Sequence, residues 1–327
     1  MSLAPYIHAM GRGPSRGRNL TREEAADAMR EILSGEAAPE AVGALLMLMR
    51  YRGETAGEVA GFVDAIRPTV AAWVDLPAVL DWPSYAAGRS RGLPWFLLSA
   101  RLVAQAGIPV LLHGWNSHQG QAADVRKALP LAGISVSQSP QEASSALVEC
   151  GITYVPLEAM SPKLLDLLRL RDVLGLRSAV NTTLRVLNPS MAPASVQGVF
   201  HPPYRTLQQD VGRLLGQPSL SVLKGGGGEF ERHPGKSVEV FGLREGGAIE
   251  VIASPLLEVA RRLADENPDI EHLSALWAGD RRDPFAEAIV LGTAAVALWS
   301  AGRTPDLPHA EEMVRRLWAV RNSAEAA

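Results

Sequence analysis

The feature that most constrains the fold is a series of short apolar runs, rich in β-branched residues, that alternate with helical patterns. The runs are "GIPVLLHG", "GITYVPL", "SVQGVF" and "LSVLKGG", and the amphipathic stretch "SPKLLDLLRLRDVLGL" lies between the second and the third. Such runs are typical of buried parallel strands in an α/β sheet. Two more runs, "SVEVFGL" and "GAIEVIAS", are separated by "REGG" and predict a hairpin at the margin of that sheet.

The first 70 residues show helical patterns only. Thr21 with Glu24, and Thr55 with Glu58, have the spacing of a capping box, and apolar residues recur at helical spacing after each. Between them "AVGALLMLMRYRG" is apolar on all sides and predicts a buried helix that ends at Gly53. Its small and apolar residues fit internal packing and an interface between subunits equally well.

These patterns predict an α/β fold in which an N-terminal helical bundle lobe precedes a large α/β lobe with a mainly parallel central sheet. We expect a helical domain over residues 1–70, with helices from about 161–187 packing on it, and an α/β domain over residues 71–327. Helical patterns at 284–301 and 309–322 close the chain. The 327 residues, 47% of them hydrophobic, suffice for a substantial core.

Charge and cysteine content narrow the classes of function. The net charge of -3 excludes a protein that is basic overall but allows a local basic patch. Cys150 is the one cysteine, which excludes an internal disulfide and suits a reducing compartment, and we expect it to be buried. No apolar run reaches the ~18 residues of a membrane helix, so we expect a cytoplasmic protein without a membrane partner.

Several segments resemble a known family. The stretch from "GRGPSRGRNLTREE" to "GETAGEVAGF", the central segments "DVLGLRSAVN", "LNP" and "QGVF", and the C-terminal "DPFAEAIVLGTAAVALWSAGRT" are similar to anthranilate phosphoribosyltransferases and their nucleoside phosphorylase relatives. The resemblance covers nearly the whole chain. It implies the same two-lobed fold and, for an active member, transfer of a phosphoribosyl group to an aromatic or nitrogenous acceptor.

The substrate motifs of that family are altered here. Its Gly-Thr-Gly-Gly-Asp turn, in which glycines let backbone N–H groups approach a pyrophosphate, matches residues 84–88, "SYAAG". Its Lys-His-Gly-Asn segment matches Leu112 to Trp115, and a Gly-Pro step matches Leu184 and Arg185. Arg171 matches the arginine that faces the acceptor's carboxylate. The resemblance therefore implies that little of the pyrophosphate cradle is left.

The magnesium motif is altered as well. The family's Asp-Glu pair matches Gly228 and Glu229 in "LKGGGGEFERHP", although a shifted alignment would supply Glu231. One carboxylate does little to neutralise a leaving pyrophosphate, so we expect no cofactor, with magnesium at Glu229 only if the chain is an active enzyme. The glycine run lacks the Gly-Lys-Ser/Thr ending of a P-loop and is interpreted as a flexible rim loop.

Several residues are candidates for contact with an anion, whereas no catalytic residue is assigned. Arginines near the altered turn suit phosphate binding, but they fit a solvated loop equally well. His113 follows a strand, where ligands of open α/β sheets bind, yet a hydrogen-bonded structural histidine is the more common case. Trp115 suits stacking on a base or filling of an emptied pocket. The candidates are Arg89, Arg91, His113, Trp115, Asn116, Arg171, Arg185, Asn188 and Lys224.

The altered motifs resemble a branch of bacterial paralogues, known as glycosyl transferase family proteins, in which a homodimer binds nucleic acid. That resemblance implies a homodimer, formed through the helical lobe, that binds nucleic acid without sequence specificity. The competing interpretation is an active phosphoribosyltransferase that uses Arg171, Asn188 and Glu229. A third is a scaffold whose first-lobe helices bind a protein partner.

Overall fold

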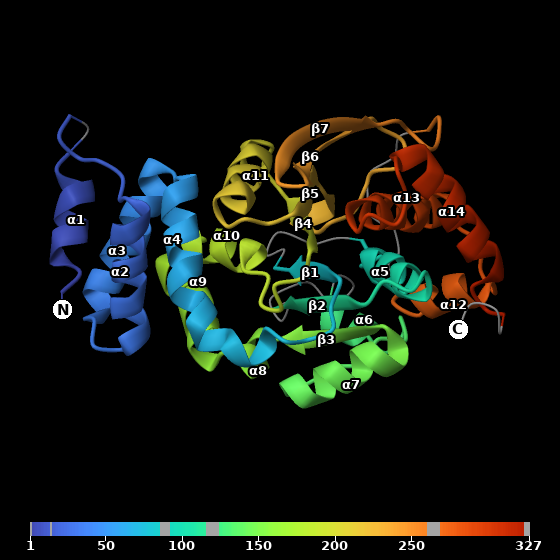
Figure 1. Ribbon diagram of the computed structural model, residues 1–327, viewed down its shortest axis with the longest axis horizontal. Coiled ribbons are helices and arrows are strands. Elements are labelled where there is room, and N and C mark those ends of the chain that lie inside the picture. The colour runs from blue at the N-terminus through green and yellow to red at the C-terminus, as the bar shows by residue number, and fades with distance from the viewer. Residues whose placement is uncertain (1, 14, 86–91, 116–123, 260–268, 324–327) are drawn as a thin grey trace.

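The computed structural model describes residues 2–13, 15–85, 92–115, 124–259 and 269–323 and confirms a helical bundle joined to an α/β domain with one mostly parallel sheet (Figure 1). The N-terminal helix α1 and the C-terminal helix α14 lie at opposite ends of the molecule, with the sheet between them (Figure 1). One apolar core lies among the bundle helices, and another lies between the sheet and the C-terminal helices.

The bundle begins with four helices: α1 (Ala4–Gly11), α2 (Arg22–Ser34), α3 (Pro39–Arg52) and α4 (Ala56–Ile66), followed by the 3-10 helix η1 (Arg67–Trp73). Both predicted capping boxes are present, because Thr21 and Thr55 accept from the backbone N–H groups of Glu24 and Glu58, whose carboxylates accept in return. α3 ends at Gly53, whose φ of 79° suits glycine.

Three helices from the middle of the chain join this bundle: α8 (Leu157–Met160), α9 (Pro162–Leu174) and α10 (Ala179–Val186). α9 contacts α3, and α10 contacts both α3 and α4. Their buried residues, which include Leu164, Leu168 and Leu184, belong to the same apolar core as α2 to α4. Segments more than a hundred residues apart are therefore brought together at the lobe boundary.

The sheet has the order β3-β2-β1-β4-β5-β6-β7. Its strands are β1 (Leu80–Ser84), β2 (Val110–Gly114), β3 (Ile152–Pro156), β4 (Ala194–Val199), β5 (Ser219–Lys224), β6 (Val238–Arg244) and β7 (Gly247–Ala253). β1 to β5 are parallel, and β6 and β7 form the predicted antiparallel hairpin at the margin. All the predicted strands are confirmed, and β1 lies outside the predicted runs.

Helices cover both faces of the sheet. α11 (Pro203–Leu214) contacts β5 and β6, while α13 (Pro284–Ser300) contacts β4, β5, α5 (Phe96–Gln105) and α14 (Leu307–Val320). The remaining described helices are α6 (Val125–Ala128), α7 (Pro140–Cys150), α12 (His272–Ala278) and the short η3 (Gly226–Gly228). None of the helices in these described ranges is long and apolar enough to cross a membrane.

The expected burial of Cys150 is wrong. Cys150 is exposed at the last position of α7. Cys150 continues the helical spacing of the buried Ala143 and Leu147, but it is the last residue of the helix, next to the C-cap Gly151.

Candidate anion-binding site

The strand order creates a switch point between β1 and β4. β2 and β3 follow β1 toward one edge of the sheet, whereas β4 and β5 extend toward the other. Chains leaving two such strands at their carboxyl ends diverge, and open α/β sheets bind ligands in the crevice that results. In this protein the crevice is bordered by Tyr85 after β1 and by Phe200 after β4.

A buried hydrogen-bond chain fills the base of this crevice. The Tyr85 hydroxyl lies 2.9 Å from Nδ1 of His113, and Nε2 of His113 lies 3.0 Å from Oδ1 of Asp81. The hydroxyl of Ser195 donates to the other carboxylate oxygen of Asp81 at 2.8 Å. Burial raises the pKa of Tyr85 well above its ordinary value, so the phenol keeps its proton. His113 therefore lies inside the fold and links β1 to β2, and no part of it is exposed.

The two glutamates that could form a metal pair already hold protein donors. Glu229 accepts from the hydroxyl of Ser84 at 2.9 Å, and Glu231 accepts from the backbone N–H of Phe96, at the start of α5, at 3.0 Å. Both carboxylates are buried. Within the described ranges no group of three or more His, Cys, Asp or Glu side chains is placed to hold a metal ion. Each of the two carboxylates is therefore held in place by a donor from the protein itself.

The glycine run, which is interpreted from the sequence as a flexible rim loop, includes the short helix η3, and its flexibility stays a prediction. The residues that follow it, Glu229 to Arg232, are buried. A Cβ at Gly225 would lie 1.6 Å from the carbonyl oxygen of Glu229, and Gly227 and Gly228 have φ values of 64° and 96°. The glycines therefore allow a tight turn that packs against its own continuation.

A pocket of about 340 Å³ lies beside the crevice, where the bundle meets the α/β domain. Its walls come from α3, α9, α10, the segment after β4 and α11. Four arginines line it together with two carboxylates: Arg50, Arg171, Arg177 and Arg185, with Glu54 and Asp172. Excess positive charge therefore gathers at one point of a chain that is acidic overall.

The arginines of this pocket are held in different ways. Arg185 donates to the backbone oxygen of Tyr85 at 3.1 Å, and Arg50 donates to the hydroxyl of Tyr204 at 2.9 Å. Arg171 lies 3.8 Å from Asp172, and its Nη1 is buried without a hydrogen-bond partner in the described chain. Arg177 has no side-chain hydrogen bond or ion pair with any described residue. Arg171 and Arg177 are therefore the two guanidinium groups best placed to receive a ligand.

Burial and mutual repulsion make this charge costly. Burial lowers the pKa of Arg177, and the nearby charges of Arg171 and Arg50 lower it further. Burial also lowers the pKa of Arg185 to about 10, although Glu229 acts in the opposite direction. A bound anion would relieve this repulsion, and planar guanidinium groups pair well with phosphate and carboxylate oxygens.

A second basic pocket, of about 520 Å³, lies on the other side of the segment after β4. Phe200 and His201 line the first pocket, whereas Pro202 and Arg205 line the second. The other titratable residues that line the second pocket are Lys224, His233, Lys236 and Glu239. Arg205 pairs with Glu239 at 2.5 Å, which leaves Lys224 and Lys236 as the cations without an ion pair among the described residues.

The other candidates from the sequence lie in different places. Arg89, Arg91 and Asn116 lie outside the described residues. Trp115 is buried in the apolar core of the bundle. Asn188, with φ of 45°, bonds to Ala192 and Gln217 and holds a turn. Neither of these two side chains lines the arginine pocket.

Sequence reasoning missed Arg50 and Arg177. Arg50 is near the end of α3, and Arg177 follows the left-handed Gly175 that ends α9. The signal was the proximity of Arg177 to Arg171 in "RLRDVLGLRSAVN", but only the fold brings α3 to the same place.

Comparison with known proteins agrees with this architecture. Residues 5–69 match the helical bundle domain of a glycosyl transferase family. The anthranilate phosphoribosyltransferase of Xanthobacter autotrophicus is 30% identical over 307 residues, which are 91% of this chain and 88% of that protein. The enzyme of the same name from Thermus thermophilus is 28% identical and matches 93% of this chain and 92% of its own length.

Solved structures show the same fold. The crystal structure of the anthranilate phosphoribosyltransferase from Thermus thermophilus aligns with 99% of this chain and 95% of its own, with a TM-score of 0.80 and 24% identity. The Saccharomyces cerevisiae enzyme in complex with PRPP and Mg aligns with 98% of this chain and 95% of its own, with a TM-score of 0.75 and 15% identity. By sequence and by fold, the chain belongs to the anthranilate phosphoribosyltransferase-like glycosyl transferase family.

Proposed function

We propose that this protein binds single-stranded nucleic acid without sequence specificity and that it has lost phosphoribosyl transfer. The observation that carries the proposal is the pocket of four arginines, in which Arg171 has a buried nitrogen without a hydrogen-bond partner in the described chain. Buried cations at this density favour an anionic ligand, because the anion replaces the lost hydration.

Two features argue against a sugar pyrophosphate as that anion. Tyr85 stands where the family has a bare backbone turn, and its side chain is buried against His113. Glu229 and Glu231, the acids nearest to the family's magnesium pair, bond to Ser84 and to the start of α5. Few groups at this place would therefore be available to neutralise the negative charge of a leaving pyrophosphate.

The arrangement of the two basic pockets supports the proposal that the ligand is a polymeric anion. They share the short segment from Phe200 to Arg205, so one strand could place phosphates in both. Phe200 is 44% exposed at the boundary and offers a ring on which a base could stack. Such contacts involve phosphates and π faces, which all sequences share, so they supply affinity without sequence preference.

The proposal includes a homodimer formed through the helical lobe. Tyr51 on α3 is 89% exposed and Val173 on α9 is 81% exposed, and these two helices contact each other. These two side chains are the apolar groups that a second subunit would cover in the proposed interface.

The test is the affinity for a labelled single-stranded oligonucleotide, measured by fluorescence anisotropy at several salt concentrations. We expect affinity to fall steeply with salt, since each neutralised phosphate releases counterions. Arg177→Gln should weaken binding of every sequence alike and lower the salt slope by about 1. Arg30→Gln, an exposed position on α2, is the control and should bind as the wild type does. Affinity that does not change with salt, or an Arg177→Gln protein that binds normally, would refute the proposal.

Active phosphoribosyl transfer is the second candidate, and family membership favours it. Arg171 lines the pocket in which such an enzyme would hold the carboxylate of an acceptor. The assay is consumption of anthranilate in the presence of phosphoribosyl pyrophosphate and Mg²⁺. Turnover that requires Mg²⁺ and is lost in Arg171→Gln would establish this activity and overturn the account of the lost pyrophosphate site.

A further inference from the structure

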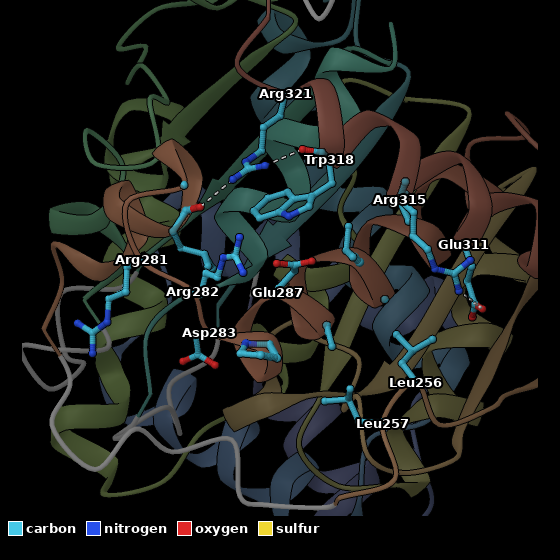
Figure 2. Close-up of a pocket in the computed structure, with 17 residues that line it drawn as sticks. Leu256, Leu257, Arg281, Arg282, Asp283, Glu287, Glu311, Arg315, Trp318 and Arg321 are labelled. Atoms are coloured by element: carbon cyan, nitrogen blue, oxygen red, sulfur yellow. Dashed lines mark hydrogen bonds and ion pairs between the residues drawn. The ribbon is translucent and has the colours of Figure 1, made fainter.

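A larger cavity, of about 700 Å³, lies among α12, α13, α14 and the segment that follows β7. Its lining shares no residue with either basic pocket. Figure 2 shows the ring of Trp318 on one side and Leu256 and Leu257 on another. Leu276, Leu291 and Val314 complete an apolar wall. The volume is in the range of pockets that enclose small organic molecules.

Most charged groups around this cavity already have partners. Asp283 accepts from the backbone N–H groups of Phe285 and Ala286, both at 3.0 Å, and so caps α13. Glu311 pairs with Arg232 at 2.7 Å and with Arg315 at 3.8 Å.

Arg321 is also held by protein groups. It donates to the backbone oxygens of Trp277, Trp318 and Leu276, and its guanidinium lies 3.9 Å from the centre of the Trp318 ring. It therefore holds the end of α12 against α14 and keeps one face of the indole fixed.

Two further charged groups, of opposite sign, have no such contacts, although the charge of Glu287 also acts on Arg321, where it opposes the lowering of the Arg321 pKa by burial. The side chains of Glu287 and Arg282 have no hydrogen bond or ion pair within the described part of the chain. Figure 2 shows both side chains directed into the cavity near Trp318, whereas the guanidinium of Arg281 is turned away from it. A carboxylate and a guanidinium thus face the same apolar space without pairing with each other.

We propose that this cavity binds a free amino acid with an apolar or aromatic side chain. The α-ammonium group pairs with Glu287, the α-carboxylate pairs with Arg282, and the side chain packs on Trp318 and the leucines. A ligand with only one charge would leave the other protein group partly desolvated and unpaired, which costs affinity. This site is independent of the proposed nucleic-acid function.

The test uses phenylalanine, leucine and tryptophan as probes, with phenethylamine and 3-phenylpropionate as analogues that lack the carboxylate or the ammonium group. Binding is measured by saturation-transfer NMR and by the rise in Tm. We expect the amino acids to bind at least about tenfold more tightly than either analogue, because each analogue loses one charged hydrogen bond. If none of the three amino acids gives a signal, or if an analogue binds as tightly as phenylalanine, the proposal is wrong.

Matched variants locate the site. In Glu287→Gln the preference for phenylalanine over 3-phenylpropionate should disappear, and in Arg282→Gln the preference over phenethylamine should disappear. Glu312→Gln and Arg316→Gln are the controls, since these two residues pair with each other on the exposed face of α14 and do not line the cavity. Phenylalanine affinity that is equal in Glu287→Gln and in the wild type would overturn the assignment.

Discussion

At the scale of single residues, polar groups inside the sheet decide what the crevice can hold. Asp81 accepts from Ser195 and from Nε2 of His113, so Nδ1 of His113 is left to accept from the protonated Tyr85. Every member of this chain is buried, and a missing member would leave a buried group without its partner. The network therefore stabilises the fold at the carboxyl ends of β1 and β2.

Tyr85→Phe tests that role. The substitution keeps the ring but leaves Nδ1 of His113 unsatisfied, so we expect the free energy of unfolding to fall by about 1–3 kcal/mol. Tyr51→Phe is the matched control, because Tyr51 is highly exposed, and it should change stability by less than about 0.5 kcal/mol. Urea unfolding followed by circular dichroism measures both values. Equal stability of the two variants would show that the hydroxyl of Tyr85 contributes nothing.

These same residues explain a limit of sequence reasoning. β1 reads "LDWPS", and its aspartate, proline and serine interrupt the apolar pattern that identified the other parallel strands. Asp81 and Ser84 are nevertheless buried, because their partners Ser195, His113 and Glu229 come from other strands and from the turn after β5. These hydrogen-bond partners are brought together only by the tertiary fold, so the local sequence of β1 contains no pattern that identifies it as a buried strand.

At the scale of elements, glycines set how closely strand ends and turns approach. A Cβ at Gly198 in β4 would lie 2.1 Å from the backbone carbon of Glu229, whereas a Cβ at Gly57, in the first turn of α4, would meet nothing within 4 Å. Backbone atoms cannot move aside as the end of a flexible side chain can, so a methyl group at Gly198 would displace the turn that carries Glu229.

We therefore expect opposite effects from one substitution at two glycines. Gly198→Ala should destabilise the protein by about 3 kcal/mol or more, since it overpacks a buried turn. Gly57→Ala should stabilise it by about 0.5–1 kcal/mol, because alanine lowers the entropy of the unfolded chain and favours the helix. Thermal unfolding of both variants in one buffer measures whether each substitution raises or lowers stability. A Gly198→Ala protein as stable as the wild type would contradict the close approach of Gly198 to the backbone of Glu229.

The elements most readily predicted were those with local signals. Both capping boxes, the all-round apolar α3, the runs of β2 to β5 and the β6–β7 hairpin contain their own patterns. The arginine pocket has no such pattern, because Arg50 and Arg171 are more than a hundred residues apart and meet only when α9 packs on α3. The family resemblance singled out Arg171 and Arg185, and the fold supplied Arg50 and Arg177.

At the scale of the whole molecule, the proposed dimer would connect separate basic surfaces. Tyr51 and Val173 lie on α3 and α9, the two helices that also supply Arg50 and Arg171 to the arginine pocket. A dimer that covers them would bring the pockets of two subunits toward each other. A chain with net charge -3 could then present an extended basic surface to a polyanion without being basic overall.

Light scattering tests this assembly. We expect the wild type to have twice the chain mass of 35.0 kDa, and the double variant Tyr51→Asp/Val173→Asp to have the mass of a single chain, because two carboxylates would have to be buried in the interface. Val148→Asp, at a residue that is 74% exposed on α7, introduces the same kind of charge away from the bundle and should stay dimeric.

If the double variant also loses the steep salt dependence of oligonucleotide binding, the arginine pockets of the two subunits bind the oligonucleotide together. A wild type that is monomeric at all concentrations, or a double variant that remains dimeric, would exclude this interface, since an exposed aspartate is tolerated only where no partner covers it.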